Sequence, residues 1–284
     1  MLRSMFSAVS GLRSHQTMMD VTGNNIANVN TTGYKASRTT FQETLTQLVR
    51  GGTAGVAGEQ GGQNPMQVGL GTQIAATDMV FTQGASQATG RPTDVAIQGD
   101  GFFVVQAGDE EVYTRGGAFS FDSVGNLVTP GGQMVLGWAV GDLDADGAPN
   151  DGAALVPIEI DPEEYTDVTI GANGTVTGRR AQDPDIGTLE DLFSLGMVRF
   201  PNVEGLEREG NGMFRDSPAA GDRILNTAGR EGLGTLQAGT LEMSNVDLAQ
   251  EFTNLIMSQR GFQANARTIS TSDELLQELV NLKR

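Results

Sequence analysis

Apolar residues recur with a seven-residue period at both ends of the chain, at alternating spacings of three and four. The front repeat runs through Leu2, Met5, Val9, Leu12, Gln16 and Met19. The longer back repeat runs through Leu248, Phe252, Leu255, Gln259, Phe262, Ala266, Ile269, Asp273, Leu276 and Val280. This spacing predicts two narrow coiled-coil seams, since a helix on a globular core carries a wider apolar stripe. The seams can pair with each other or with those of other copies, which points to a structural polymer subunit.

After the front repeat, the pattern changes to turn-forming and small residues. Residues 24–33 hold four asparagines and Gly33, and they end the first helix because such side chains hydrogen-bond to nearby backbone. A short amphipathic piece follows over about 38–49. Residues 51–71 are mostly Gly, Ala, Gln and Thr, and this composition cannot bury enough apolar surface to fold alone. They predict a linker, or a segment that becomes ordered only against neighbours.

Short strands are predicted from about residue 73 onward. Residues 94–105 form a β run broken by a turn at Gly99, Asp100 and Gly101, and residues 113–129 form a hairpin around Gly125-Asn126. Further strands are expected at 155–160, 167–170, 175–177, 195–200 and 235–242. All nine prolines lie between Pro65 and Pro218, outside both heptad repeats. The pattern assigns no fold to about 142–230, although Trp138 is expected to be a strand residue packed on the core.

These elements predict an α+β fold. The N- and C-terminal helices pair as a coiled coil and are joined through an extended linker to a mainly antiparallel β domain. The expected divisions are residues 1–30 with 245–284 for the helical part, 31–75 for the connector and 76–244 for the β-rich outer domain.

Composition and charge exclude several classes of function. The chain has 284 residues and no cysteine, which excludes disulfides, thiolate metal sites and thiol catalysis. No stretch approaches the roughly 20 consecutive apolar residues of a membrane-spanning helix. Arg3 and Arg13 interrupt any apolar signal core, so export would need another route. The net charge is −17, with +3 in residues 1–50, −1 in residues 245–284 and therefore −19 between them. Nucleic acid and anionic membranes would repel such a body.

Few residues suggest chemistry. The segment from Asp142 to Gly147 has the alternating carboxylates that open a calcium loop, but Ala153 stands where the bidentate glutamate belongs, which favours an acidic turn. His15 is the single histidine and lies on the first heptad helix, where an interface role is favoured over general-base catalysis. The acidic runs at 109–111 and 163–164 fall in expected loops. We therefore predict no enzyme activity, no catalytic residues, no cofactor and no metal site.

Three segments resemble a known family, the bacterial flagellar axial proteins of the rod, hook and hook-associated structures. Residues 20–35, DVTGNNIANVNTTGYK, are similar to its N-terminal signature. Residues 244–248, SNVDL, and 259–266, QRGFQANA, are similar to its C-terminal half. Residues 279–284, LVNLKR, resemble the end of a hook protein, and residues 94–105 and 113–129 extend the similarity into the β region.

The resemblance implies a tube subunit whose terminal helices line a central channel, with the β region outside. It implies self-association, contacts with rod, hook-cap and hook–filament junction proteins, and passage through the flagellar type III export apparatus to the flagellum outside the cell. Residues 64–71 and 136–138 are more similar to short hook proteins of Gram-positive bacteria, which favours the hook, a flexible joint that transmits torque. The long Gly/Gln stretch resembles the one that stiffens distal rods, so the distal rod is the alternative.

Residues of the two seams and of the signature are predicted to carry self-assembly. They are Leu2, Met5, Val9, Leu12, Met19, Asn24, Asn25, Ile26, Asn28, Leu248, Phe252, Leu255, Gln259, Phe262, Ala266, Ile269, Leu276 and Val280. A more distant alternative is a secreted β module that binds a ligand and oligomerises through its ends. That alternative requires a pocket with converging polar groups, and the sequence offers no such constellation.

Overall fold

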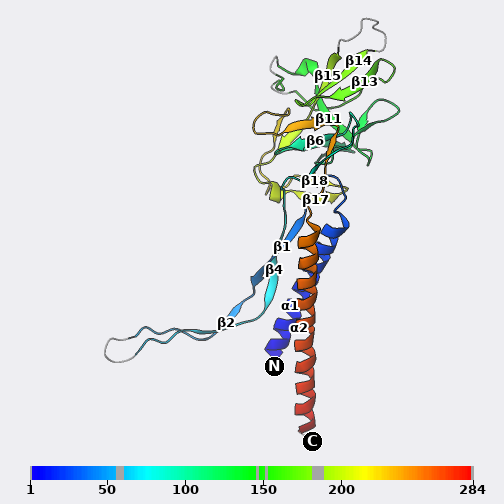
Figure 1. The fold of residues 1–284 in the computed structure, drawn as a ribbon. Helices are drawn as coiled ribbons and strands as arrows, with labels where there is room; N and C mark the ends of the chain where they lie inside the picture. The colour runs from blue at the N-terminus through cyan, green and yellow to red at the C-terminus, as the bar shows by residue number, and fades with distance from the viewer. Residues whose placement is uncertain (1, 56–60, 145–146, 151–152, 181–188, 283–284) are drawn as a thin grey trace. The chain divides into compact units, whose positions relative to one another are not determined.

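The computed structural model describes residues 2–55, 61–144, 147–150, 153–180 and 189–282 (Figure 1). The chain divides into two compact units. Unit 1 consists of residues 1–27, 37–80 and 247–284, and unit 2 consists of residues 28–36 and 81–246. Each unit is therefore built from stretches that are distant in the sequence.

Unit 1 holds two long helices, α1 (Leu2–Ala27) and α2 (Leu248–Leu282). Both helices were predicted from the heptad repeats, and both are confirmed. They lie side by side and antiparallel, because positions 11 and 15 of α1 face positions 265 and 261 of α2 (Figure 1). At about 1.5 Å per residue, α2 is some 13 Å longer than α1. In this register its last turns extend past the start of α1.

Unit 1 also contains two antiparallel strand pairs between residues 37 and 80. Strand β1 (Ser37–Glu43) pairs with β4 (Thr72–Met79), and the register shifts between Thr40 and Phe41. Strand β2 (Thr46–Arg50) pairs with β3 (Met66–Gly69) and continues this ribbon outward. The sequence predicted a connector over 31–75 and a linker over 51–71, whereas the described residues of this stretch include β1, β2, β3 and the start of β4. Thr53, which follows β2, and Gln63, which precedes β3, form a further antiparallel β-bridge.

Gly71 lies in the turn between β3 and β4, at a position that requires glycine. Its φ is +119°, and a Cβ built there would lie 2.1 Å from the Ser10 side-chain oxygen on α1. The next residue, Thr72, donates its backbone N–H to Ser10 Oγ at 3.2 Å. The backbone of the ribbon therefore contacts α1 at a distance that only glycine permits.

Unit 2 is a β body in which every strand pairing is antiparallel. Its strands are β5 (Ser86–Ala88), β6 (Val95–Gln98), β7 (Phe102–Ala107), β8 (Glu110–Thr114), β9 (Ser120–Phe121), β10 (Leu127–Val128), β11 (Met134–Ala139), β12 (Val156–Pro157), β13 (Tyr165–Ile170), β14 (Thr175–Arg180), β15 (Leu189–Leu195), β16 (Met197–Arg199), β17 (Glu207–Gly210), β18 (Met213–Arg215), β19 (Ile224–Asn226), β20 (Thr235–Ala238) and β21 (Thr240–Glu242). Two short 3-10 helices, η1 (Val140–Asp142) and η2 (Val203–Gly205), complete it.

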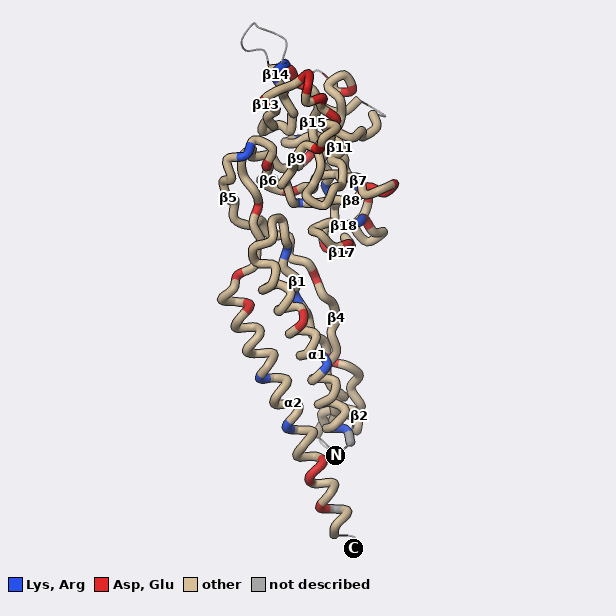
Figure 2. The backbone as a smooth tube through the Cα atoms, turned by 90° about the vertical axis from the view of Figure 1, so that its right-hand side faces the viewer, with Lys and Arg blue, Asp and Glu red and all other residues tan. Residues whose placement is uncertain are grey.

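One large sheet dominates the body. Its central path runs β13-β14-β15-β11-β7-β8-β18-β17. The stretch 142–230 contributes an outer three-stranded ladder, β13 to β15, and the β16–β19 and β17–β18 pairs. The strands expected at 167–170 and 175–177 are present as β13 and β14, and the one expected at 195–200 corresponds to the end of β15 and to β16. The predicted mainly antiparallel β domain is confirmed. Acidic residues recur on its strands and loops, for example around β17 and β18 and near β14 (Figure 2).

The hydrophobic core of the β body is made of apolar side chains from its strands and loops. Its fully buried members include Val95, Ile97, Phe103, Val105, Val112, Phe119, Leu127, Val135, Ile158, Val176, Leu195 and Met197. Trp138 lies on β11 with 2% of its surface exposed, as predicted. The predicted turns are also present, because Gly99, Gly101 and Gly125 all have positive φ. Burying each large apolar side chain contributes about 1.5–3 kcal/mol, so the body folds around this layer.

Candidate assembly surface

The contact between α1 and α2 is made of small and polar residues. A Cβ at Gly11 would lie 2.8 Å from Asn265 Nδ2, and one at Gly261 would lie 2.5 Å from His15 Nε2. The buried residues of the described helices are likewise small or polar, namely Ala8, Ser14, Thr22, Asn25, Ser258 and Ser272. Gly11 and Gly261 therefore let the two helices approach at a distance that a Cβ would obstruct.

None of the described apolar heptad residues is fully buried in a single chain. Val9, Leu248, Phe252, Gln259 and Val280 are exposed, and Phe252 and Val280 keep 49% and 66% of their surfaces accessible. Met5, Leu12, Met19, Leu255, Phe262, Ala266, Ile269 and Leu276 are partly buried. Leu2 belongs to α1, but its side chain lies outside the described part of the structure. Within one chain, the residues of the predicted seams therefore keep part or most of their surface accessible.

The heptad pattern missed several exposed apolar residues of the same helices. Phe6 is 70% exposed, and Ile256, Met257 and Leu275 are each about half exposed. Phe6, Ile256 and Leu275 lie one position away from the repeat and Met257 lies two, so a strict seven-residue count skips them. A wider apolar stripe on each helix would have included them.

The signature asparagines have separate roles. Asn25 is buried and joins α1 to β1, because its Nδ2 donates to Ser37 O at 2.8 Å and its Oδ1 accepts from Ser37 N at 3.0 Å. Asn28 accepts from the Thr31 hydroxyl and backbone N–H in the turn that follows. Asn24 is exposed and Ile26 is partly buried.

The ribbon formed by β2 and β3 exposes apolar side chains along its whole length. Every residue of both strands is exposed. The apolar ones in and beside these strands are Leu45, Leu48, Val49, Met66, Val68 and Leu70. An isolated two-stranded ribbon is only marginally stable in water. A cluster of exposed apolar residues on such a ribbon is typical of an interaction surface.

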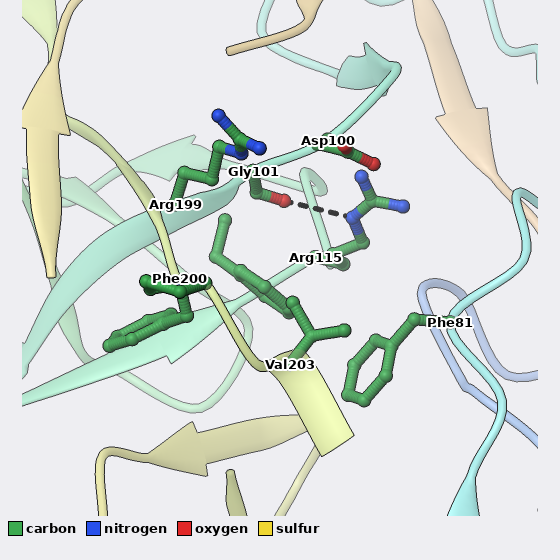
Figure 3. Close-up of a pocket in the computed structure, with 9 residues that line it drawn as sticks. Phe81, Asp100, Gly101, Arg115, Arg199, Phe200 and Val203 are labelled. Carbon is green, nitrogen blue, oxygen red and sulfur yellow. Dashed lines mark hydrogen bonds between the residues drawn. The ribbon is translucent and has the colours of Figure 1, made fainter. Parts of the chain in front are cut away.

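The cavity drawn in Figure 3 lies in unit 2 and measures about 180 Å³. Arg115 donates its Nε–H to Gly101 O at 2.9 Å, and Arg199 donates to Glu231 O at 3.3 Å. The remaining lining is largely aromatic, with Phe102 stacked edge-on against Phe81 and Phe200. Asp100 is the one carboxylate among the described lining residues, and no histidine or nucleophilic side chain joins it. This arrangement lacks the acid–base pair that catalysis would need.

The other candidate groups occupy structural positions. His15 packs against Phe41 in unit 1, with ring centroids 5.8 Å apart. The 109–111 carboxylates lie on the rim of the body, where Glu110 pairs with Arg215 and Glu111 with Arg223. Of the suspected calcium loop, residues 145–146 lie outside the described residues. Among those described, no group of three His, Cys, Asp or Glu side chains converges, and no helix is long and apolar enough to cross a membrane.

Sequence reasoning missed a buried ion cluster in unit 2. Lys35 Nζ lies 2.7 Å from Glu242 Oε1, and Arg115 Nη1 lies 3.6 Å from Glu242 Oε2. Burial, reinforced by the charge of Arg115, lowers the pKa of Lys35, although Glu242 opposes the shift. Burial likewise lowers the pKa of Arg115. No local sequence pattern predicts this ion cluster, because its members are 80 or more positions apart in the sequence.

Comparison with known proteins places these features in a family. Residues 5–35 match the family described as flagella basal body rod protein, residues 96–178 match the flagellar hook protein FlgE/F/G D1 domain, and residues 237–282 match the flagellar basal body rod FlgEFG protein C-terminal region. Flagellar basal-body rod protein FlgG of Bacillus subtilis is 44% identical over the whole of both chains, and FlgG of Borreliella burgdorferi is 37% identical over the same extent. Flagellar hook protein FlgE of Borreliella burgdorferi is 29% identical, also over both whole chains.

These relatives are structural proteins of the flagellum, and their similarity extends through both helices and the β body. The resemblance seen in the terminal signatures is therefore confirmed, and with it the flagellar location. The chain belongs to the family of flagellar rod and hook axial proteins, whose members polymerise into the axial structures of the flagellum.

Proposed function

We propose that this chain is a subunit of the flagellar basal-body rod and polymerises with its own copies into a stiff tube. The observation that carries the proposal is the full-length similarity to rod proteins of nearly the same length, 44% over 285 aligned residues. Similarity to the Borreliella burgdorferi hook protein requires 442 aligned positions, because that relative is longer. The sequence alone favoured the hook, and these lengths favour its alternative.

The exposed apolar stripe of α1 and α2 is the proposed axial contact. Phe252, Leu248 and Val280 keep much of their surface accessible in a single chain. Burying a large apolar side chain contributes about 1.5–3 kcal/mol, and a half-exposed Phe252 can still gain roughly half of that. The predicted self-assembly residues would thus pair as seams between copies, while the small residues hold the two helices of one copy together.

The β2–β3 ribbon is the proposed source of stiffness. Its arms carry exposed Leu48 and Val68, and neither strand buries a residue in a single chain. Docking the ribbon on a neighbouring copy would add a second contact per subunit outside the helices. Two separate contacts resist bending better than one, which suits a drive shaft.

The hook is the second candidate. The observation that favours it is the similarity to several hook proteins, including one from Helicobacter mustelae that is 39% identical over 72% of this chain. In either role, the neighbours would be other rod and hook proteins, the hook cap and junction proteins, and the type III export apparatus.

Electron microscopy of the purified chain after concentration tests the proposal. Straight, stiff tubes are the expected result, curved or bendable tubes would establish the hook instead, and monomers at every concentration would contradict self-polymerisation. Leu48→Asp should give tubes of lower stiffness, and Thr46→Asp, at a polar exposed position of the same strand, serves as its control.

A further inference from the structure

Three segments connect unit 2 to the rest of the chain. The first is residues 28–36, between α1 and β1; the second starts at residue 81, after β4; the third ends at residue 246, before α2. Any force that reaches the body through the backbone must pass along one of them. Their contacts with one another inside unit 2 therefore decide whether they act together or separately.

Each of the three segments is bonded to the other two. Lys35 Nζ donates to Thr82 O at 2.8 Å and to Glu242 Oε1 at 2.7 Å. Glu242 Oε1 also accepts from the Gly84 backbone N–H at 2.8 Å. Asn245 Oδ1 accepts from the Ala36 backbone N–H at 2.8 Å, and Asn245 Nδ2 donates to the Thr82 side-chain oxygen at 2.9 Å.

Backbone bonds follow the same pattern. Gly33 donates its N–H to Glu242 O at 2.8 Å, and Met243 donates to Ala85 O at 2.8 Å. Gly33 has a φ of +68°, and a Cβ there would lie 2.7 Å from the Gly116 nitrogen. The first segment thus lies directly against the backbone that follows β8, which is where Arg115 originates.

The charges in this cluster are deeply buried. The side chains of Lys35, Glu242 and Arg115 expose 0%, 1% and 4% of their surfaces. Lys35 and Arg115 share the Glu242 carboxylate, and Asp100 also attracts Arg115. Buried ion pairs rarely stabilise a fold more than apolar residues would, but separating the partners is costly because each buried charge then lacks its counter-ion. Such a cluster favours one arrangement of its segments over all others.

We propose that Lys35, Glu242 and Asn245, backed by Arg115, form a clasp that makes the three connecting segments move as one block. Opening one segment then requires opening all three. Without the clasp, the hydrogen bonds of each segment would open independently. Mechanical force would then reach the β body through the three segments unequally. The proposal concerns the single chain, so it stands whether the polymer is a rod or a hook.

Hydrogen exchange of the full-length chain, followed by mass spectrometry, tests the clasp in the variant Lys35→Met. This variant leaves Glu242 paired with Arg115. The two acceptors of Lys35 keep another donor, because Glu242 Oε1 still accepts from Gly84 N–H and Thr82 O still accepts from Asn245 Nδ2. The expected result is exchange at least about tenfold faster in all three segments, with the amides of Ala36, Gly84 and Met243 as reporters. Faster exchange confined to residues 33–36, or no change, would overturn the clasp.

Two further measurements separate the clasp from general stability. The unfolding midpoint of Lys35→Met, followed by Trp138 fluorescence, should be unchanged or higher, because a buried charge has been removed. A lower midpoint with faster exchange throughout β7 and β8 would contradict the proposal. Glu242→Gln removes the carboxylate that Lys35 and Arg115 share and should open the segments more than Lys35→Met does. A smaller effect would also contradict the proposal. Arg180→Gln removes an exposed ion pair of the same body and is the control.

Discussion

Gly261 on α2 allows a sharp test of the helix contact. A Cβ at this position would lie 2.5, 2.6 and 2.9 Å from three ring atoms of His15 on α1. The ring also packs against Phe41, with centroids 5.8 Å apart, and its Nδ1 is buried, so moving it would disturb a second contact. Gly261→Ala therefore sets two opposing effects against each other, the helix propensity of alanine and the crowding of the imidazole.

The sizes of these two effects decide whether Gly261→Ala raises or lowers the stability of the helices. Alanine in place of glycine inside a helix gains about 1 kcal/mol. Inserting a methyl group into a packed contact costs about 1–3 kcal/mol. We expect Gly261→Ala to lose about 1 kcal/mol of net stability. In the His15→Ala background the clash is gone, so the same substitution should gain about 1 kcal/mol.

Denaturant unfolding of the full-length chain, followed by circular dichroism at 222 nm, measures this difference. The matched control is Gly23→Ala on α1, where a Cβ meets nothing within 4 Å and the gain should be about 1 kcal/mol. Trp138 fluorescence reports the β body and should not change. The reasoning is refuted if Gly261→Ala stabilises the helices while His15 is present, or if removing His15 does not reverse the sign.

Three further predictions concern the signature, the seam and the buried lysine. Asn25→Ala leaves a backbone donor and acceptor of Ser37 without partners and should cost about 2–4 kcal/mol in the helical unfolding transition. Phe262→Asp should abolish tube formation in electron micrographs while Trp138 emission stays native, whereas the exposed control Gln263→Asp should assemble. Because the pKa of Lys35 is lowered in the folded state, the unfolded chain binds more protons between that pKa and 10.5. Unfolding free energy should therefore rise with pH across that window, and Lys35→Met should flatten the rise; an equal slope in both chains would exclude Lys35 as its source.

The sequence correctly predicted elements that are determined by residues close together in the chain. The heptad spacing identified both helices, and the β run interrupted by the glycines at 99 and 101 identified β6, β7 and their turn. Trp138 was placed correctly because an apolar run flanks it on both sides. In each case the residues that determine the structure lie within about ten positions of one another.

Elements defined by distant partners could not be predicted. The ribbon arms β2 and β3 pair across a glycine-rich stretch whose composition is typical of a linker, so only the register between Thr46 and Gly69 reveals them. Strands at 167–170 and 175–177 were predicted, but their place in the fold was not: β13 and β14 join the large sheet through β15, which pairs with the distant β11. The contact between the helices was missed for a different reason: it uses Gly11 and Gly261, which a search for apolar residues ignores.

The distribution of side chains on the helices is the reverse of that in a globular protein. Asn25, Ser14 and Ser258 are buried, while Phe6 and Phe252 face outward. Exposed apolar surface costs free energy that only association can recover. The buried polar residues hydrogen-bond and fix the geometry of one chain, as Asn25 does with Ser37. The exposed apolar residues then remain available to other copies. Assembly of the kind proposed above would cover these helices and remove that cost.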